Sequence, residues 1–379
     1  MQRRPALVAL VSLPWLARTA YAAGDAVSAT RTLVFPRDFG AHPETRTEWW
    51  YATGWLSDTA GAAAASATGT TTAKPAYGFQ ITFFRSRTDV DTAHPSRFAA
   101  GQLIFAHAAV TDLARGRLHH DQRIARSGFG IAGADEQDTA VTLRDWQLQR
   151  NRIDNAAHTT SRYRAQARSD NAGFAIDLQL TSTQPLLLQG IAGYSQKGPQ
   201  PAQASHYYSQ PQLAVQGTLT LDGKAQTLQG RAWLDHEWSD SLLDPQAVGW
   251  DWIGMNLADG SALTAFRLRR SDGSTLFAGG SLRTAGGATR NFSAEEVTFT
   301  PGRVWASPAT RANYPVQWTV RTPAGIHTVT ALLDDQELDS RNSTGAIYWE
   351  GLSELRDAAG RSVGHGYLEM TGYANPLRL

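Results

Sequence analysis

The sequence contains no cysteine, and it has almost no excess of charge of either sign. Without cysteine the chain can form no disulfide, no thiolate nucleophile and no cysteine-ligated zinc or iron–sulfur cluster. The 35 lysines and arginines against 34 aspartates and glutamates leave a net charge of +1. So small an excess cannot neutralise a phosphate backbone, and we expect no nucleic-acid partner. The pair His119-His120 has no third ligand at a useful spacing, and we expect neither a metal nor a cofactor.

Long hydrophobic runs are also missing after the N-terminus, where no stretch approaches the roughly 18 apolar residues that would span a membrane. At the N-terminus, Arg3-Arg4 precede an apolar run from Pro5 to Leu16, and Ala20-Tyr21-Ala22 follows. This order predicts a signal peptide over residues 1–22 that is cleaved after Ala22. The paired arginines leave the general secretory and twin-arginine routes both open. We therefore expect an exported, soluble protein, periplasmic or extracellular, that works close to a membrane.

The chain is rich in segments where apolar and polar residues alternate. Residues Tyr77–Phe83 and Phe174–Leu180 each place large apolar side chains on one face of a strand. The pairs Asp222-Gly223, Asp259-Gly260 and Asp272-Gly273 lie between alternating runs and predict tight hairpins. No convincing helix of three turns is present. The predicted fold class is all-β, a sandwich or an up-and-down barrel of antiparallel strands.

A length of 379 residues suits two domains. Residues Thr59 to Lys74 are almost entirely Ala, Thr, Gly and Ser and predict a mobile loop. The segment from Gln196 to Pro211 holds three prolines, and proline is excluded from central strands. We therefore predict one domain over residues 23–200 and a second over 212–379, each long enough for a barrel of about eight strands.

The 12 tryptophans gather with acidic residues in clusters. In the first, Glu48-Trp49-Trp50-Tyr51, a strand would place Glu48 and Trp50 on one face and Trp49 and Tyr51 on the other. Two interpretations of this cluster remain open. Its residues pack in the core and form one ion pair, or they place a carboxylate in a pocket. The second, Asp235-His236-Glu237-Trp238, is followed by Trp250-Asp251-Trp252. It is the densest group of ionisable residues in the chain and the preferred candidate for a functional site.

The third cluster closes the chain with Tyr348-Trp349-Glu350 and the segment from Gly364 to Tyr373. Its glycines indicate bulges or a close backbone approach in a final hairpin. Closure of the second barrel is the favoured interpretation. A site that includes Glu350 or Glu369 is the alternative.

Four segments from these clusters resemble one family of proteins. They are FPRDFGAHPETRTEWWYATGWL, GRAWLDHEWSD, YWEGL and GYLEMTGY. Such strings are similar to those of the AttH-type secreted proteins and the carotenoid hydratases, and the resemblance covers essentially the whole chain after the signal peptide. It implies a fold of two lipocalin-like barrels packed together. It also implies either hydration of acyclic carotenoids or a role beside an ABC exporter.

The resemblance can be carried over residue by residue only in part. The His-x-Trp pair of the hydratases falls on His236 and Trp238. The family's Tyr-x-Asp pair has no counterpart near Phe266, so Asp251 and either Tyr207 or Tyr208 are expected to supply those functions.

Hydration of an isolated C=C bond needs an acid, a surface that tolerates a carbocation and a base that directs water. Burial beside indoles raises the pKa of a carboxylic acid, and indole faces attract a cation by roughly 0.5–2 kcal/mol. We expect Asp235 or Glu237 to be the acid and His236 the base. The predicted catalytic residues are His236, Trp238, Asp235, Glu237 and Asp251. The predicted ligand-binding residues are Glu48, Trp49, Trp50, Tyr51, Tyr207, Tyr208, Trp250, Trp252 and Trp349.

Two functions remain open from the sequence. The first is a cofactor-free hydro-lyase, monomeric, that binds a long apolar isoprenoid or carotenoid-like ligand in a cavity lined by tryptophans. The second is a non-enzymatic carrier of such a ligand, or an accessory protein of an ABC export system. Aromatic walls suit both.

Overall fold

The computed structural model describes residues 27–58, 74–91, 93–154, 159–241 and 243–377. The predicted signal peptide, and residues 59–73 of the predicted mobile loop, lie outside these ranges. Strands dominate the described residues, and two short 3₁₀ helices, η1 (Arg37–Phe39) and η2 (Ala294–Glu296), are the helices found there. Among the described residues, none belongs to a helix long and apolar enough to cross a membrane. The all-β fold class is thereby confirmed.

Sheet A is an antiparallel sheet of 13 strands that nearly closes into a barrel. Its strand order is β4-β3-β2-β1-β13-β12-β9-β8-β7-β6-β5, with β10 and β11 both paired to β12. The strands are β1 (Thr47–Asp58), β2 (Tyr77–Arg87), β3 (Gln102–Asp112), β4 (Arg117–Arg126), β5 (Ala132–Ala134), β6 (Ala140–Leu143), β7 (Trp146–Asp154), β8 (Thr159–Ser169), β9 (Phe174–Thr181), β10 (Leu187–Leu188), β11 (Tyr194–Gln196), β12 (Ala204–Leu221) and β13 (Lys224–Ser239).

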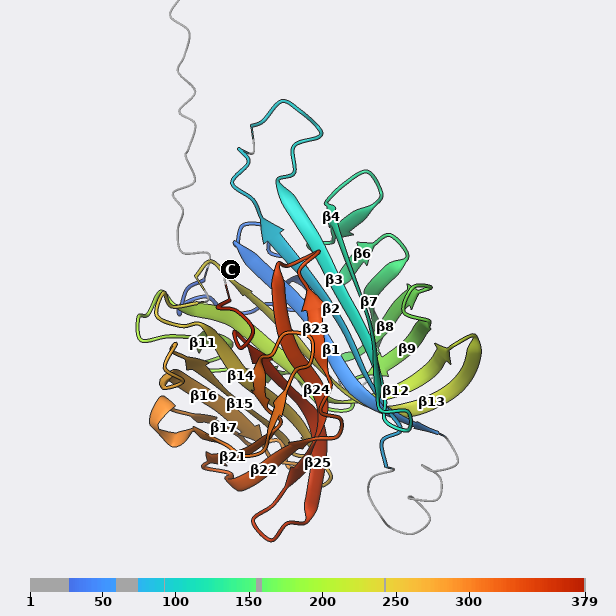
Figure 1. Cartoon of the computed structure of the whole chain (residues 1–379). Coiled ribbons are helices and arrows are strands. Elements are labelled where there is room, and N and C mark those ends of the chain that lie inside the picture. Colours follow the sequence, from blue (N-terminus) through green and yellow to red (C-terminus); the bar gives the residue numbers. More distant parts are fainter. Residues whose placement is uncertain (1–26, 59–73, 92, 155–158, 242, 378–379) are drawn as a thin grey trace, which may run out of the picture.

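Sheet B has 10 strands in the order β17-β16-β15-β14-β25-β24-β22-β21-β18, with β23 paired to β24. A small separate sheet joins β19 (Val304–Ala306) to β20 (Asn313–Pro315). The strands of sheet B are β14 (Gly249–Leu257), β15 (Ala262–Arg269), β16 (Thr275–Arg283), β17 (Thr289–Phe292), β18 (Thr298–Pro301), β21 (Gln317–Thr322), β22 (Gly325–Ala331), β23 (Glu337–Ser340), β24 (Ala346–Arg356) and β25 (Ser362–Thr371). In Figure 1 the two sheets lie side by side, and β24 and β25 pack against β2 and β1.

The local sequence signals explain these strands. The alternating run Phe174–Thr181 forms β9, whose residues are buried and half-buried in turn. Each of the three Asp-Gly pairs lies in a hairpin, between β12 and β13, β14 and β15, and β15 and β16. At the first, Asp222 and Gly223 take φ values of 47° and 77°, the left-handed conformation that a tight hairpin turn requires.

Sheet A continues past residues 200–212, where the sequence predicts a domain division. Strands β12 and β13 both extend beyond it, and both pair within sheet A, so the chain passes to sheet B only after β13. Pro211 does not end β12, because it lies in a bulge where the pairing register shifts between Gln210 and Leu213. A bulge is one of the few places where a paired strand accommodates proline, which lacks an N–H group.

Strands β1 and β13 are buried on both faces. One face packs inside sheet A, and the other faces sheet B, where the candidate site lies. On β1, Trp50 and Leu56 belong to the core inside sheet A, whereas Tyr51 and Trp55 point toward sheet B. Sheet B has a core of its own. A third core therefore joins the sheets, and it contains Tyr51, Trp55, Leu187, Trp233, Trp252, Ala262, Phe266, Leu352 and Tyr367.

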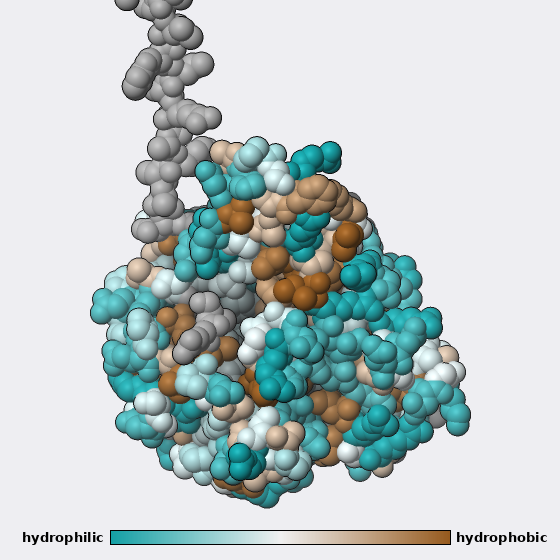
Figure 2. Space-filling view, turned by 45° about the horizontal axis from the view of Figure 1, so that its top comes forward, coloured by the Kyte–Doolittle hydropathy of each residue, from teal (hydrophilic) through white to brown (hydrophobic). Residues whose placement is uncertain are grey.

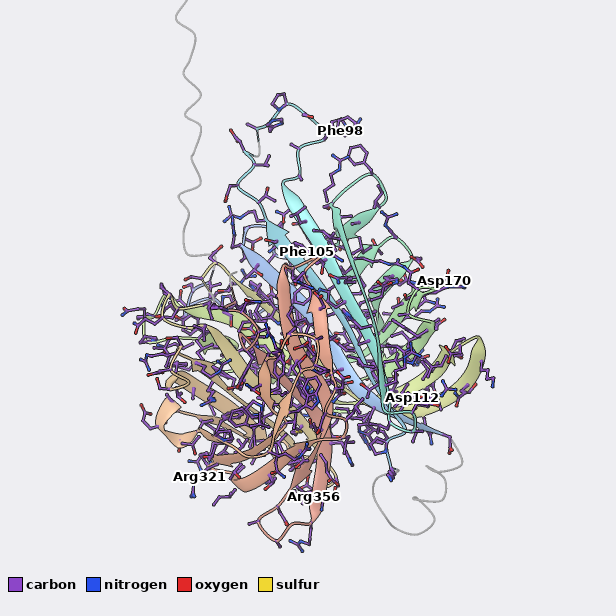
Figure 3. All side chains as sticks on the ribbon, viewed as in Figure 1. Phe98, Phe105, Asp112, Asp170, Arg321 and Arg356 are labelled. Atoms are coloured by element: carbon purple, nitrogen blue, oxygen red, sulfur yellow. The ribbon has the colours of Figure 1, made fainter. Side chains whose placement is uncertain are left out.

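The face of the molecule in Figure 2 is mostly hydrophilic, with scattered apolar patches. Phe98 lies in the loop that follows β2, far from Asp112 at the other end of β3 (Figure 3). Its ring stacks on Phe129 with 5.5 Å between centroids, and the Arg126 guanidinium lies over both rings. The side chains in Figure 3 otherwise crowd between the strands, where the cores lie.

Candidate functional site

A cavity of about 130 Å³ lies between the two sheets, and we call it the intersheet pocket. Sheet A contributes strands β1, β2, β12 and β13 to its wall, and sheet B contributes β14, β15, β24 and β25. Several predicted site residues meet there although they come from separate clusters. The lining is Thr47, Trp49, Tyr51, Thr82, Phe84, Lys197, Tyr207, Asp235, Glu237, Trp250, Trp252, Phe266, Leu268, Tyr348, Glu350 and Glu369.

The pairing of β1 with β13 fixes the acidic wall of the pocket. Tyr51 lies opposite Asp235 and Trp49 lies opposite Glu237 in this antiparallel ladder. Because side chains alternate along a strand, Asp235 and Glu237 both point into the pocket. Asp235 is 4% exposed and Glu237 is 5% exposed, so both carboxyl groups are nearly desolvated.

Three donors surround the carboxyl group of Asp235. The Tyr207 hydroxyl donates to Oδ2 at 2.8 Å, while the Ser209 hydroxyl and the Trp233 indole N–H donate to Oδ1 at 2.5 and 2.6 Å. Burial raises the pKa of Asp235, these hydrogen bonds lower it, and the neighbouring charge of Glu237 raises it again. Burial prevails and brings the pKa to about 7, so a large fraction of Asp235 is protonated at neutral pH.

Glu237 has a different partner. The Lys197 ammonium group lies 3.1 Å from its Oε1, and the Ser205 hydroxyl donates to the same atom at 2.5 Å. The Lys197 ammonium is also 4.5 Å from the ring centroids of both Tyr207 and Phe266. Lys197 therefore supplies Glu237 with a cationic partner, whereas the three donors around Asp235 are neutral groups. The two acids on this face of β13 thus have different electrostatic surroundings.

Two further carboxyl groups form the sheet B wall. Glu350 on β24 lies directly opposite Glu369 on β25. The Trp250 indole donates to Glu369 at 3.1 Å, and the Gln80 amide donates to Glu350 at 2.6 Å. Burial raises the pKa of Glu369 to about 7, with contributions from the charges of Asp235 and Glu237. Burial and the charge of Glu369 raise the pKa of Glu350 well above its usual value.

His236 and Trp238 lie on the other face of β13, inside sheet A, and they do not line the intersheet pocket. His236 Nε2 is 2.8 Å from Glu48 Oε1, and its Nδ1 is 3.0 Å from the Tyr208 hydroxyl. Trp50 stacks on the His236 ring, with 4.7 Å between centroids. Four predicted site residues, Glu48, Trp50, Tyr208 and His236, therefore meet in a second buried cluster, separate from Asp235.

His42 completes this second cluster. Its Nδ1 is 2.8 Å from Glu48 Oε1 and its Nε2 is 3.0 Å from Asp38 Oδ1, so both ring nitrogens face carboxylates and must donate. Burial lowers the pKa of His42, but its hydrogen bonds to Asp38 and Glu48 outweigh burial and raise it. His42 is therefore an imidazolium. Burial lowers the pKa of His236 to about 4, which keeps that ring neutral.

The second cluster also contains the ligand types of a metal centre. His42, Glu48 and His236 each offer one ligand atom, and these atoms lie within 4.8 Å of one another. However, Arg85 Nε already donates to Glu48 Oε2 at 2.7 Å, so a divalent cation would lie beside a guanidinium and would have to displace the proton of His42. The electrostatics favour a hydrogen-bonded ionic network over a metal centre.

The remaining predicted residues lie inside sheet B. Arg267 Nε donates to Asp251 at 2.7 Å, and the Tyr373 hydroxyl donates to the same carboxylate at 2.8 Å. Trp349 is fully buried in the core of sheet B, and its indole donates to the Asp334 carbonyl at 2.7 Å. Asp251 and Trp349 thus do not line the intersheet pocket, whereas Trp250 and Trp252 do.

Lys197 and Phe266 line the pocket without having been predicted. Lys197 belongs to the proline-rich segment at the predicted domain boundary. Phe266 was named only as the place where the family's Tyr-x-Asp pair is missing. A lone lysine near prolines is an ordinary surface pattern, so the sequence offered no signal for it. Its role becomes visible only through the salt bridge to Glu237.

A nearly closed antiparallel barrel joined to a second large sheet defines a lipocalin-like fold. The chain belongs to the AttH-like family, whose model matches residues 26–373. An AttH crystal structure from Nitrosomonas europaea is 46% identical, with a TM-score of 0.79, and the match covers 92% of this chain and 99% of that one. No match was found among curated proteins.

More distant structures share the fold alone. Kievitone hydratase from Nectria haematococca has a TM-score of 0.62 at 15% identity, with 92% of this chain and 94% of that chain covered. The structure of CghA with Sch210972 has a TM-score of 0.51 at 13% identity, and the match covers 92% of this chain and 97% of that one. The resemblance to the AttH-type proteins is confirmed as a matter of family, and the likeness to a hydratase is confirmed as a matter of fold.

Proposed function

We propose that the chain is a cofactor-free hydro-lyase that adds water to a C=C bond of an apolar ligand bound in the intersheet pocket. One observation carries the proposal: two adjacent buried carboxyl groups line one aromatic pocket, and only Glu237 is paired with a cation. Two carboxyl groups in different electrostatic surroundings are the arrangement that acid–base catalysis uses. The hydratase fold of kievitone hydratase agrees with this class of reaction.

The proposed reaction uses each group once. Asp235 transfers its carboxyl proton to one alkene carbon, and the π electrons form the new C–H bond, which leaves a carbocation on the other carbon. Trp49, Trp250 and Trp252 surround the pocket, and their ring faces stabilise a cation by roughly 0.5–2 kcal/mol. Water then attacks the cation, and Glu237 accepts the proton that water loses. Proton return from Glu237 to Asp235 through solvent closes the cycle.

This assignment moves the base from His236 to Glu237. Both nitrogens of His236 are hydrogen-bonded inside sheet A, on the face of β13 opposite to the pocket. A water molecule in the pocket would contact Glu237 instead. In this proposal His236 supports the strand that carries the two acids.

The test is turnover in isotopically labelled water, with kievitone and a prenyl alcohol as probes. We expect label in the product with the wild-type protein and none with Asp235→Asn, while probe binding is retained. Asp240→Asn, an exposed aspartate just beyond β13, is the matched control and should leave turnover unchanged. Binding without labelled product in the wild type would contradict the enzyme and support the alternative function, a carrier or an accessory protein of an ABC exporter.

We further propose that the protein acts outside the cytoplasm. The support is the order of Arg3-Arg4, an apolar run and Ala20-Tyr21-Ala22 at the N-terminus. An envelope-purified protein whose N-terminus is Ala23 would support export, and an intact Met1 would contradict it.

A further inference from the structure

We infer that the intersheet pocket is the inner part of a longer ligand site. The ligand would be an elongated molecule with a small unsaturated head and an extended apolar tail. The tail would occupy a second cavity of about 510 Å³, which we call the outer cavity, between the segment Gln189–Gln196 and the strands β15, β16 and β17. This inference rests on the proposed function and adds the place where the rest of the ligand lies.

The size of the intersheet pocket is the first argument. An apolar cavity of about 150 Å³ holds one benzene molecule, and sites for small ligands usually have roughly 300–1,000 Å³. At about 130 Å³ the intersheet pocket has room for one ring or one isoprene unit, whereas the outer cavity, at about 510 Å³, lies in the usual range. A larger ligand must therefore extend beyond the acids.

The two cavities share a wall of side chains. Tyr207 and Phe266 line both, and the Lys197 ammonium lies between their rings. Gly279 faces Phe266 from β16, where a Cβ would lie only 3.0 Å from the ring, so glycine leaves the ring its space. Side chains thus separate the two cavities at this wall, and a ligand that spans both would have to displace the Phe266 ring.

The two cavities differ in charge. The intersheet pocket, which would hold the head of the ligand, is charged, and the outer cavity, which would hold the apolar tail, is nearly uncharged. Lys197, Asp235, Glu237, Glu350 and Glu369 line the intersheet pocket. Among the described residues around the outer cavity, Glu295 alone carries a charge, and the rings of Phe277 and Phe292 form part of the wall. Ile191 is 78% exposed where the outer cavity meets solvent. The chemistry therefore occurs at the inner end, and the outer end supplies apolar contact.

The test compares binding of prenyl alcohols with one, two, three and four isoprene units by titration calorimetry. We expect the affinity of the wild-type protein to rise about tenfold or more with each of the first two added units, because each buries apolar surface. Ala294 is half-buried in η2 and lines the outer cavity away from Phe266. Ala294→Trp should weaken binding of the three-unit alcohol about tenfold or more and change binding of the one-unit alcohol less than about twofold.

Ala288→Trp places the same side chain on the exposed turn between β16 and β17 and is the matched control. Equal melting temperatures of both variants and the wild type would show that the folds are intact. Equal affinity for all chain lengths, or equal effects of the two tryptophans, would overturn the outer cavity as a tail site. Failure of the wild type to bind even the one-unit alcohol would overturn the proposed function as well, so the two failures are distinguishable.

Discussion

Tyr207 and Tyr208 are neighbours in the chain, yet their hydroxyl groups serve different clusters. The Tyr207 hydroxyl donates to Asp235 Oδ2 at 2.8 Å in the intersheet pocket. The Tyr208 hydroxyl is 3.0 Å from His236 Nδ1 inside sheet A. The two tyrosines therefore allow the intersheet pocket to be compared with the cluster inside sheet A, because a hydroxyl group can be removed from either one.

Replacement of Tyr207 by phenylalanine should raise the pKa of Asp235 above its value of about 7, because one hydrogen bond that favours the carboxylate is lost. If Asp235 is the acid, the alkaline limb of the pH–rate profile then moves to higher pH. Tyr208→Phe should leave that limb where it is in the wild type. Equal shifts in the two variants, measured as rate against pH with the same probe, would contradict the assignment of Asp235.

At the scale of residues, the alternation of side chains along β1 and β13 is as the sequence analysis expected. The sequence could not say which face meets sheet B, because both faces of these strands carry tryptophans together with ionisable residues, and both are buried. For that reason His236 and Asp235 were placed in one mechanism although they lie in separate clusters. Asp251 was expected to stand in for the family's missing Tyr-x-Asp pair, but its carboxylate pairs with Arg267 inside sheet B.

At the scale of elements, the pairing of β1 with β13 brings Trp49 and Tyr51 beside the two acids. Gly230 on β13 lies so close to β1 that a Cβ would be 1.8 Å from the Trp55 carbonyl oxygen. Gly230→Ala should therefore lower the free energy of unfolding by about 1–3 kcal/mol, because the two strands must separate locally. Urea unfolding measures this change.

Gly133→Ala on β5 is the control for this variant. A Cβ at Gly133 would have no atom within 4 Å, and alanine in a strand restricts the unfolded chain more than glycine does. Gly133→Ala should be neutral or slightly stabilising. A loss of stability as large as that of Gly230→Ala would mean that lost glycine flexibility, and not the contact with Trp55, explains both.

The hairpins at the Asp-Gly pairs were predictable because their signal is local. The position in the sequence where sheet A ends could not be predicted, because Pro211 is equally compatible with a linker and with a bulge. Only the pairing of β12 with β13 on both sides of the bulge decides between these interpretations. That pairing depends on contacts between distant parts of the chain, which a local pattern does not contain.

At the scale of the whole molecule, both clusters depend on contacts between distant segments. Glu48 and His236 are 188 residues apart in sequence and hydrogen-bonded in the fold. The intersheet pocket exists only because sheet B covers the outer faces of β1 and β13. The sequence identified most of the residues at these places, but not their grouping, which follows from how the two sheets pack.

Acids buried between the sheets also make the stability of the molecule depend on pH. The pKa values of Asp235 and Glu369 are about 7 in the folded protein, against ordinary values of 3.8 and 4.5. Between these values the folded state holds more protons than the unfolded state, so the free energy of unfolding falls as pH rises. Below the ordinary histidine pKa of about 6.5, buried neutral histidines such as His107 and His236 oppose this trend, because they gain protons on unfolding.

Between about pH 6.5 and 8, therefore, the stability changes because the acids titrate, and these histidines contribute little to the change. Wild-type stability, measured by urea unfolding, should fall across this range. The double variant Asp235→Asn/Glu369→Gln should have a flatter profile, because neither amide binds a proton. His42, whose raised pKa acts in the same direction as the acids, is present in both proteins and cancels in the comparison. A double variant of two exposed acids, Glu136→Gln/Asp240→Asn, should keep the wild-type slope. Equal slopes in the wild type and the pocket variant would mean that Asp235 and Glu369 are ionised at neutral pH, and the proposed acid, Asp235, would then have no proton to give.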